Sequence, residues 1–296
     1  MGGEKIFAGL IAAAGAGWLA GCGGGKAVVV GSKNFTEQVI LGEIAAQHLG
    51  HRLARRVDRK LNLCGTLLAH QALLQGGLDL YPEYTGTALT AILKLPLSSD
   101  PADVFAKVRA EYLSRFRIHW LEPLGFNNTF AMVIRGEDAQ RNRIESLSDA
   151  ARYGPGWTLG VGYEFQQRPD GLPGLLKTYK LPIKDSPKTM DLGLLYKALE
   201  QKQVDMVAAN ATDGLLSVMD VKVLRDDKRY FPPYQAVFTV RADALAACPG
   251  LKDALDLLSG KFSDESMRAL NYQVDGKHRP VNEVAATFLR AAGLLA

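Results

Sequence analysis

Short apolar runs alternate with helical patterns along most of the chain, and this alternation restricts the fold more than any other feature. The run at 27–30 is fully apolar, as expected of a buried parallel strand, and a helical pattern over 37–49 follows it, with Gly50 as its expected end. Strand patterns at 59–63 and 78–81 are each followed by another helical pattern. Strands and helices joined by short connections predict an α/β fold with parallel strands and crossover helices.

The stretch at 78–87 is the most informative of these units. Pro82 has no N–H to give to a sheet, so we expect the strand to stop there or to lie at a sheet edge. The turn after it carries Tyr84 and Thr87, and such turns display ligand-contacting groups in α/β folds. Polar loops follow strands in both halves of the sequence, one of them at 164–171. This repetition suggests two α/β lobes with a ligand between them.

Composition and charge exclude several classes of protein. The chain has 296 residues, 47% of them hydrophobic, which is enough for a substantial core. Its formal net charge of +4 is small, and no stripe of Lys and Arg is interleaved with aromatic residues. We therefore expect no nucleic acid partner.

The N-terminus has the features of a targeting segment. Lys5 precedes an apolar run over 6–20, which is too short to span a bilayer comfortably. The run ends in Leu-Ala-Gly-Cys at 19–22, which resembles a bacterial lipobox. The resemblance implies a lipoprotein signal peptide over 1–22 and lipidation of Cys22; a plain secretory peptide or a short core helix is the alternative. We expect an exported, periplasmic or extracytoplasmic protein that is anchored to the membrane through Cys22.

The sequence offers little support for catalysis. It has no nucleophile elbow, P-loop, zinc-protease helix or dinucleotide fingerprint. Glu83 and Glu164 could form a carboxylate pair, but nothing in the sequence brings them together. Cys64 and Cys248 have no metal-binding spacing, and we expect two buried thiols rather than a disulfide. The histidines lack a patterned partner and are expected at the surface: His48, His51, His70, His119 and His278. We predict no enzyme activity, no cofactor and no metal site.

The polar loops favour binding of a zwitterion instead. Several aromatic rings together can desolvate and hold a quaternary ammonium group. Cations and hydroxyls suit a carboxylate, which Arg can bind in bidentate fashion. The loops offer both kinds of residue: the rings of Tyr84, Phe130, Tyr163, Phe165 and Tyr234, and the polar groups of Lys33, Thr87 and Arg168.

Five motifs carry a resemblance to a known family. They are GSKNFTEQ at 31–38, LDLYPEYTGTAL at 78–89, GFNNTF at 125–130, YEFQQRPDGLPGL at 163–175 and DDKRYFPPY at 226–234. In this order they resemble the glycine betaine/choline/carnitine-binding proteins of osmoprotectant ABC importers. The resemblance implies a two-lobed, type II periplasmic-binding-protein fold with the ligand in the interlobe cleft. Lobe one would comprise 27–128 plus 235–296, and lobe two 129–234.

The resemblance also implies roles for single residues. Tyr84, Phe130 and Tyr234 match the aromatic cage around the quaternary ammonium, with Phe130 where a tyrosine is usual. Lys33, Thr87 and Arg168 match the positions that hold the betaine carboxylate. Asn210 stands where the family has a further cage tyrosine, so one aromatic wall is replaced by a hydrogen-bonding amide.

The function implied is that of a monomeric receptor that binds a small quaternary-ammonium solute and delivers it to an ABC permease in the cytoplasmic membrane. Because of Asn210, the same fold could instead bind a polyol or an amino acid. An effector domain of a regulator and an enzyme on this scaffold are the alternatives from other classes; the first would need DNA-linked binding, and the second turnover of the ligand.

Overall fold

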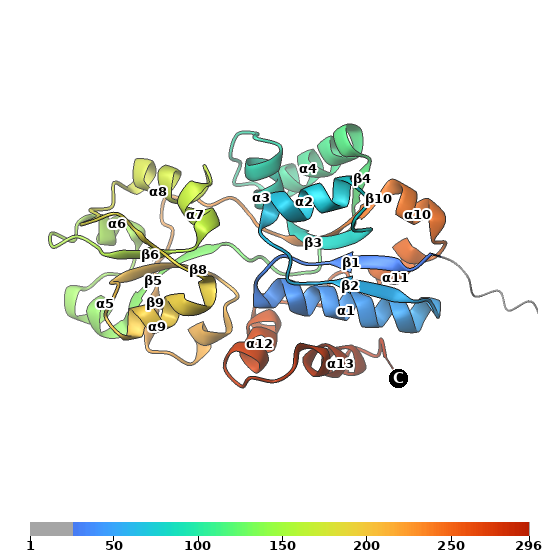
Figure 1. Ribbon diagram of the computed structural model, residues 1–296. Helices are drawn as coiled ribbons and strands as arrows, with labels where there is room; N and C mark the ends of the chain where they lie inside the picture. The colour runs from blue at the N-terminus through green and yellow to red at the C-terminus, as the bar shows by residue number, and fades with distance from the viewer. Residues whose placement is uncertain (1–25, 296) are drawn as a thin grey trace, which may run out of the picture.

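Two five-stranded mixed sheets, each covered by helices, form two lobes side by side (Figure 1). The computed structural model describes residues 26–295, so the predicted signal peptide and Cys22 lie outside the described residues. The sheet of lobe one has the order β2-β1-β3-β10-β4, and the sheet of lobe two has the order β7-β6-β8-β5-β9. This is the predicted α/β architecture.

Lobe one contains β1 (Val28–Gly31), α1 (Thr36–Leu53), β2 (Val57–Lys60), α2 (Thr66–Leu74), β3 (Leu80–Tyr84), α3 (Thr85–Thr87), the π-helix η1 (Ala88–Ile92), α4 (Pro101–Phe116), β4 (Ile118–Trp120), β10 (Ala236–Arg241), α10 (Ala242–Ala247), α11 (Leu251–Asp256), α12 (Asp264–Asp275) and α13 (Val281–Ala291). Lobe two contains β5 (Phe130–Arg135), α5 (Gly136–Asn142), α6 (Leu147–Ala151), β6 (Leu159–Val161), α7 (Tyr163–Gln167), α8 (Leu172–Tyr179), β7 (Lys188–Thr189), the 3-10 helix η2 (Leu192–Leu194), α9 (Leu195–Glu200), β8 (Met206–Asn210), the 3-10 helix η3 (Gly214–Ser217) and β9 (Val221–Val223).

The chain passes between the two sheets twice, once between β4 and β5 and once between β9 and β10. The predicted lobe boundaries at 128/129 and 234/235 fall inside these two connections. In each sheet the strand that follows a connection, β5 or β10, pairs antiparallel with its neighbours. Movement of the lobes about these connections remains a prediction.

The expectation for Pro82 was wrong, because β3 is a central strand that is buried along its whole length. β3 pairs with β1 only at Leu80, opposite Val30. On the other side of β3, Pro82 lies opposite Phe238 of β10. The carbonyl of Phe238 points away from Pro82 and accepts a hydrogen bond from the N–H of Leu121, just after β4. Pro82 therefore occupies a position where the sheet needs no N–H from it, and a proline can stand in a central strand.

Three further local expectations were wrong in part. α1 continues through Gly50 and ends at Leu53, where Ala54 adopts a left-handed conformation (φ 47°). The polar segment 164–171 is not all loop, because α7 forms over its first half and the chain leaves it in an extended conformation at Arg168. The two cysteines are free, as expected, and Cys248 is buried, but Cys64 is exposed rather than buried.

The histidine expectation failed at two positions, His48 and His70, which are 1% and 4% exposed. The ring of His48 contacts the carbonyls of Ala254 and Leu294, so it joins α1 to the C-terminal segments. His70 packs edge-on against the rings of Tyr112 and Phe116. Neither contact provides a carboxylate partner for base catalysis.

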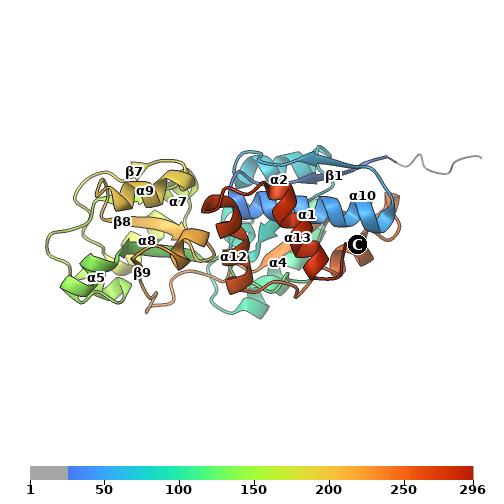
Figure 2. The same ribbon diagram turned by 90° about the horizontal axis from the view of Figure 1, so that it is seen from below.

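The C-terminal helices complete lobe one and reach lobe two. α13 packs along α1, and α12 lies at the junction of the lobes, against η3 of lobe two (Figure 2). Ser263 caps α12 in a reciprocal capping box with Ser266, which defines where this helix begins. Within residues 26–295, no helix combines the length and the apolar character needed to cross a membrane.

Candidate functional site

A cavity of about 720 Å³ lies between the two lobes, within the usual size range for small-ligand sites. All seven residues proposed from the sequence line it: Lys33, Tyr84, Thr87, Phe130, Arg168, Asn210 and Tyr234. They come from segments spread over 200 positions of the chain. The structure thus brings the candidate residues together, and their role in binding remains a proposal.

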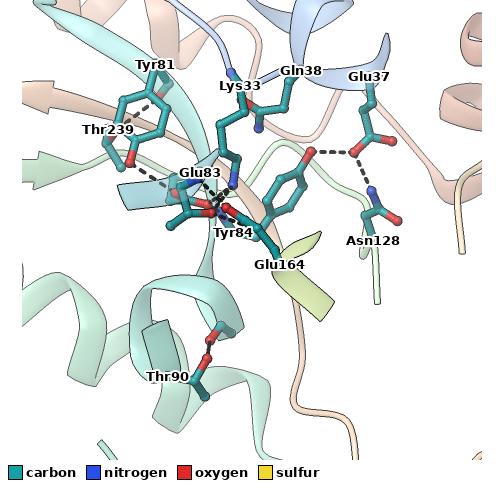
Figure 3. A network of polar contacts seen from close by, with 12 residues as sticks. Lys33, Glu37, Gln38, Tyr81, Glu83, Tyr84, Thr90, Asn128, Glu164 and Thr239 are labelled. Atoms are coloured by element: carbon teal, nitrogen blue, oxygen red, sulfur yellow. Dashed lines mark hydrogen bonds and ion pairs between the residues drawn. The ribbon is translucent and has the colours of Figure 1, made fainter. Parts of the chain in front are cut away.

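On the lobe-one side, Lys33 forms a buried ion pair with Glu83 at the end of β3 (Figure 3). Lys33 Nζ lies 2.6 Å from Glu83 Oε1, and the two side chains are only 4% and 0% exposed. Glu83 also accepts from the Tyr81 hydroxyl (3.0 Å) and from the backbone N–H of Tyr84 (2.7 Å). Lys33 is therefore paired before any ligand arrives, and its ammonium lies 4.8 Å from the centre of the Tyr84 ring.

Glu37, at the start of α1, is the centre of a second buried cluster. Its carboxylate accepts from Tyr84 Oη (2.6 Å), Asn128 Nδ2 (2.8 Å), Thr212 Oγ1 (2.5 Å) and Asn271 Nδ2 (3.1 Å). Burial raises the pKa of Glu37, and these four hydrogen bonds oppose that rise. Since Thr212 belongs to lobe two, one carboxylate both orients the Tyr84 ring and joins the lobes.

On the lobe-two side, the Arg168 guanidinium lies among aromatic rings. Its Cζ is 5.2 Å from the centre of the Phe130 ring and 5.9 Å from that of Tyr234. Asp170 holds it through two hydrogen bonds, one of them Nε to Oδ1 at 3.0 Å, and also accepts from Tyr234 Oη (2.6 Å). Although burial acts against it, the charge of Arg168 lowers the pKa of Asp170. These rings are thus placed at cation–π distance from a positive charge.

Glu164 joins the lobes at the edge of the cavity. Its carboxylate accepts from the backbone N–H (2.5 Å) and the hydroxyl (3.0 Å) of Thr66, at the start of α2. Burial acts to raise its pKa, but Lys33 and Arg168 hold the pKa below its usual value. Both Glu83 and Glu164 thus lie near Lys33, as partners of cations rather than as a carboxylate pair for acid–base chemistry.

Asn210 and Phe130 stand directly opposite each other on β8 and β5, so their side chains share one face of the sheet. Asp213 follows in the next turn and accepts from Asn210 N (3.0 Å) and from Tyr196 Oη (3.0 Å). Burial raises the pKa of Asp213 to about 6. An amide and a carboxylate therefore form the wall where the related family is expected to have a tyrosine.

The cavity lining contains more acidic than basic side chains. Among the described residues it includes the carboxylates of Glu37, Glu164, Asp191, Asp213 and Asp275, and only the two cations Lys33 and Arg168. Both cations already have carboxylate partners. Aromatic rings within an acidic lining suit a positively charged group on a ligand. Within residues 26–295 no cluster of His, Cys, Asp and Glu suits a metal ion.

Three carboxylates of this site escaped the sequence reasoning: Glu37, Asp170 and Asp213. Glu37 and Asp170 lie inside the quoted motifs at 31–38 and 163–175, next to residues that were singled out. A charged residue at the start of a helix with a long apolar face, as Glu37 is, could have been identified as a buried partner. Asp213 shows no such signal, because its contact with Asn210 depends on the turn after β8.

The order of the strands in both sheets, with one antiparallel strand inserted after each connection, and the cavity between the lobes are those of a type II solute-binding protein. Over residues 26–291 the chain matches the family described as "Substrate binding domain of ABC-type glycine betaine transport system", and it belongs to that family. The sequence resemblance is thereby confirmed. The family consists of substrate-binding proteins of transporters rather than of enzymes.

Two curated relatives and one solved structure are similar over most of the chain. The chain is 37% identical over 271 residues to the "Ergothioneine transport permease/ergothioneine binding protein EgtU" of Helicobacter pylori, covering 91% of this chain and 48% of that protein. It spans only about half the length of that relative. The "Carnitine transport binding protein OpuCC" of Listeria monocytogenes is 33% identical, covering 92% of this chain and 89% of the relative. A "glycine betaine/carnitine/choline ABC transporter" structure superposes with a TM-score of 0.75 at 30% identity, covering 90% of this chain and 99% of that one.

Proposed function

We propose that this protein is the extracytoplasmic receptor of an ABC importer and binds a small solute with a quaternary ammonium group. One observation carries the proposal: three aromatic rings from both lobes, Tyr84, Phe130 and Tyr234, line a single cavity with an excess of carboxylates. Rings provide the cation–π attraction, and the acidic lining favours a positive charge without a fixed hydrogen-bond geometry. The ligands named for the relatives, ergothioneine and carnitine, share a trimethylammonium group.

We propose that Arg168, the cation of lobe two, also binds the carboxylate of the solute. Arg168 uses Nε and Nη2 to bind Asp170, whereas within residues 26–295 the one contact of Nη1 is 3.5 Å long, to Glu164. Because a guanidinium has five N–H donors, Nη1 can donate hydrogen bonds to a ligand carboxylate while Nε and Nη2 stay bound to Asp170. Lys33 and Thr87 would complete this end of the site, as the family resemblance implies.

Delivery of the solute requires a membrane permease, which we propose as a separate partner. Lipid anchoring through Cys22 would keep the receptor, as a monomer, beside that permease. Palmitate labelling of cells that express the full chain, compared with cells that express Cys22→Ser, tests the anchor. Equal labelling of the two would refute it.

Calorimetric titration of the purified protein tests the substrate class. We expect micromolar binding of at least one of glycine betaine, choline, carnitine and proline betaine, and no binding of an uncharged polyol. A folded protein that binds none of the amines but binds a polyol or an amino acid would refute the quaternary-ammonium proposal. Arg168→Ala, with its fold checked by thermal unfolding, should weaken betaine and carnitine much more than choline, which has no carboxylate.

A further inference from the structure

The wall formed by Asn210 and Asp213 presents hydrogen-bond acceptors to the cavity. Asn210 Nδ2 lies 3.4 Å from Asp213 Oδ1. A carboxylate only accepts hydrogen bonds, so the nitrogen side of the amide must face Asp213, and Oδ1 of Asn210 faces away from it. Among residues 26–295 no donor contacts that amide oxygen, although Asn210 lines the cavity.

Asp213 adds a second acceptor to the same wall. Its Oδ2 accepts from both the Asn210 N–H and the Tyr196 hydroxyl, whereas Oδ1 has, among the described residues, only the long contact with Asn210 Nδ2. We call Asn210 and Asp213 the acceptor pair. A ligand that places a donor here would satisfy two oxygens that the described part of the protein leaves with little or no hydrogen bonding.

The cavity also has room for an additional group beside the acceptor pair. Ala208, two residues before Asn210 on β8, lies on the same face of the strand and lines the cavity too. A tyrosine at position 210 would fill the space next to Phe130, and the shorter asparagine leaves it open. The rings of Tyr84, Phe130 and Tyr234 still line the cavity.

We propose that the solute carries a side arm with a hydrogen-bond donor, O–H or N–H, in addition to its quaternary ammonium, and that the acceptor pair binds this donor. The inference rests on the proposed function and narrows its substrate class. The negative charge of Asp213 would repel a ligand carboxylate, so the carboxylate must point toward Arg168 and the arm toward β8. Glycine betaine has no donor, and it would leave both acceptors unsatisfied.

Two pairs of ligands, each matched except for the donor, test the proposal on the unmodified protein by calorimetry. Carnitine differs from 4-trimethylammoniobutanoate by one hydroxyl, so comparing their affinities measures the effect of an O–H donor. Histidine betaine and phenylalanine betaine are compared in the same way to measure the effect of a ring N–H. We expect the donor-bearing member of at least one pair to bind 10-fold or more tightly, and the responding pair identifies the arm. Equal affinities within both pairs would overturn the proposal while leaving the quaternary-ammonium function intact. If no member of either pair binds but glycine betaine or choline does, the side-arm proposal is overturned and the proposed function stands; if none of these amines binds, the proposed function itself fails.

Variants locate the effect on the acceptor pair. Asn210→Leu should reduce the difference in affinity between the two ligands of the responding pair to less than 3-fold, because it removes the amide oxygen but keeps the side-chain size. Asn34→Leu makes the same change at an exposed position of the cavity rim and should leave the difference unchanged. Asn210→Tyr should raise glycine betaine affinity about 10-fold by restoring an aromatic wall, and should remove the preference for the arm. A preference that survives both Asn210 variants would overturn the assignment.

Discussion

The two walls of the cavity differ in how completely their polar groups are paired. On the lobe-one wall, Lys33, Glu37, Glu83 and Tyr84 are all less than 5% exposed, and their charged or hydroxyl groups bond one another or close neighbours. On the lobe-two wall, Arg168 is paired with Asp170, but the acceptor pair is only partly buried, and the amide oxygen of Asn210 has no donor among the described residues.

This difference shows which part of the site the fold itself determines. Buried charges must be paired to be tolerated, so the lobe-one wall has a fixed arrangement that contributes to folding. The acceptor pair is not needed in this way, and its unused hydrogen-bonding capacity is available to a ligand. We therefore expect loss of a paired group on the lobe-one wall to affect mainly stability, and changes of Asn210 in the acceptor pair to affect mainly selectivity.

The largest effect is expected for Glu83→Ala on the lobe-one wall. Removing one partner leaves the buried ammonium of Lys33 without a counterion, which costs about 3–5 kcal/mol of unfolding free energy. Urea unfolding measures the change. The control is Lys107→Ala, which breaks the exposed Lys107–Asp103 pair and should cost less than about 1 kcal/mol. A similar loss for both variants would show that the lobe-one wall is not the paired structure described above.

A smaller loss, about 2–4 kcal/mol, is expected for Glu37→Ala, which leaves four donors unsatisfied. Glu37→Gln is the matched control and should cost less, because the hydroxyls of Tyr84 and Thr212 can turn from donors into acceptors. Unfolding free energies and solute affinities of both variants check this order. If the alanine variant were as stable as the native protein, Glu37 would have no role in joining the lobes.

The same contrast separates what the sequence predicted from what it did not. The α/β class followed from the alternation of strand and helix patterns, and the seven cavity residues followed from the family resemblance, to which polar residues near strand ends such as Lys33 and Thr87 pointed. The pairing of Lys33 with Glu83 and of Arg168 with Asp170 was missed, since no local pattern shows which buried carboxylate a cation will meet. The errors at Pro82 and Gly50 have a related cause: tertiary packing overrode the local preference of a single residue.

On the lobe-two wall we expect Asp213→Asn to increase stability at neutral pH. Burial raises the pKa of Asp213 to about 6, so the folded protein binds this proton more tightly than the unfolded chain does. The contribution of Asp213 to stability is therefore highest below about pH 4 and falls as the pH rises through 6, by at most about 3 kcal/mol. Asp213→Asn removes this loss. The unfolding free energies measured at pH 4, 6 and 8 should therefore change less with pH for the variant than for the native protein. An unchanged pH dependence would contradict the raised pKa.

The smallest effect on stability is expected for Glu164→Gln, where the two walls meet. The side chain of Glu164 is 42% exposed, and glutamine can still accept the Thr66 N–H through its carbonyl. We expect less than about 1 kcal/mol of unfolding free energy to be lost. Solute release should be about 2- to 5-fold faster, because the second hydrogen bond between the lobes is lost or weakened; stopped-flow displacement measures this rate. A stability loss as large as that of Glu83→Ala would mean that Glu164 is part of the fixed wall. The effect of a carboxylate on stability would then depend less on how exposed that carboxylate is than the comparison of the two walls predicts.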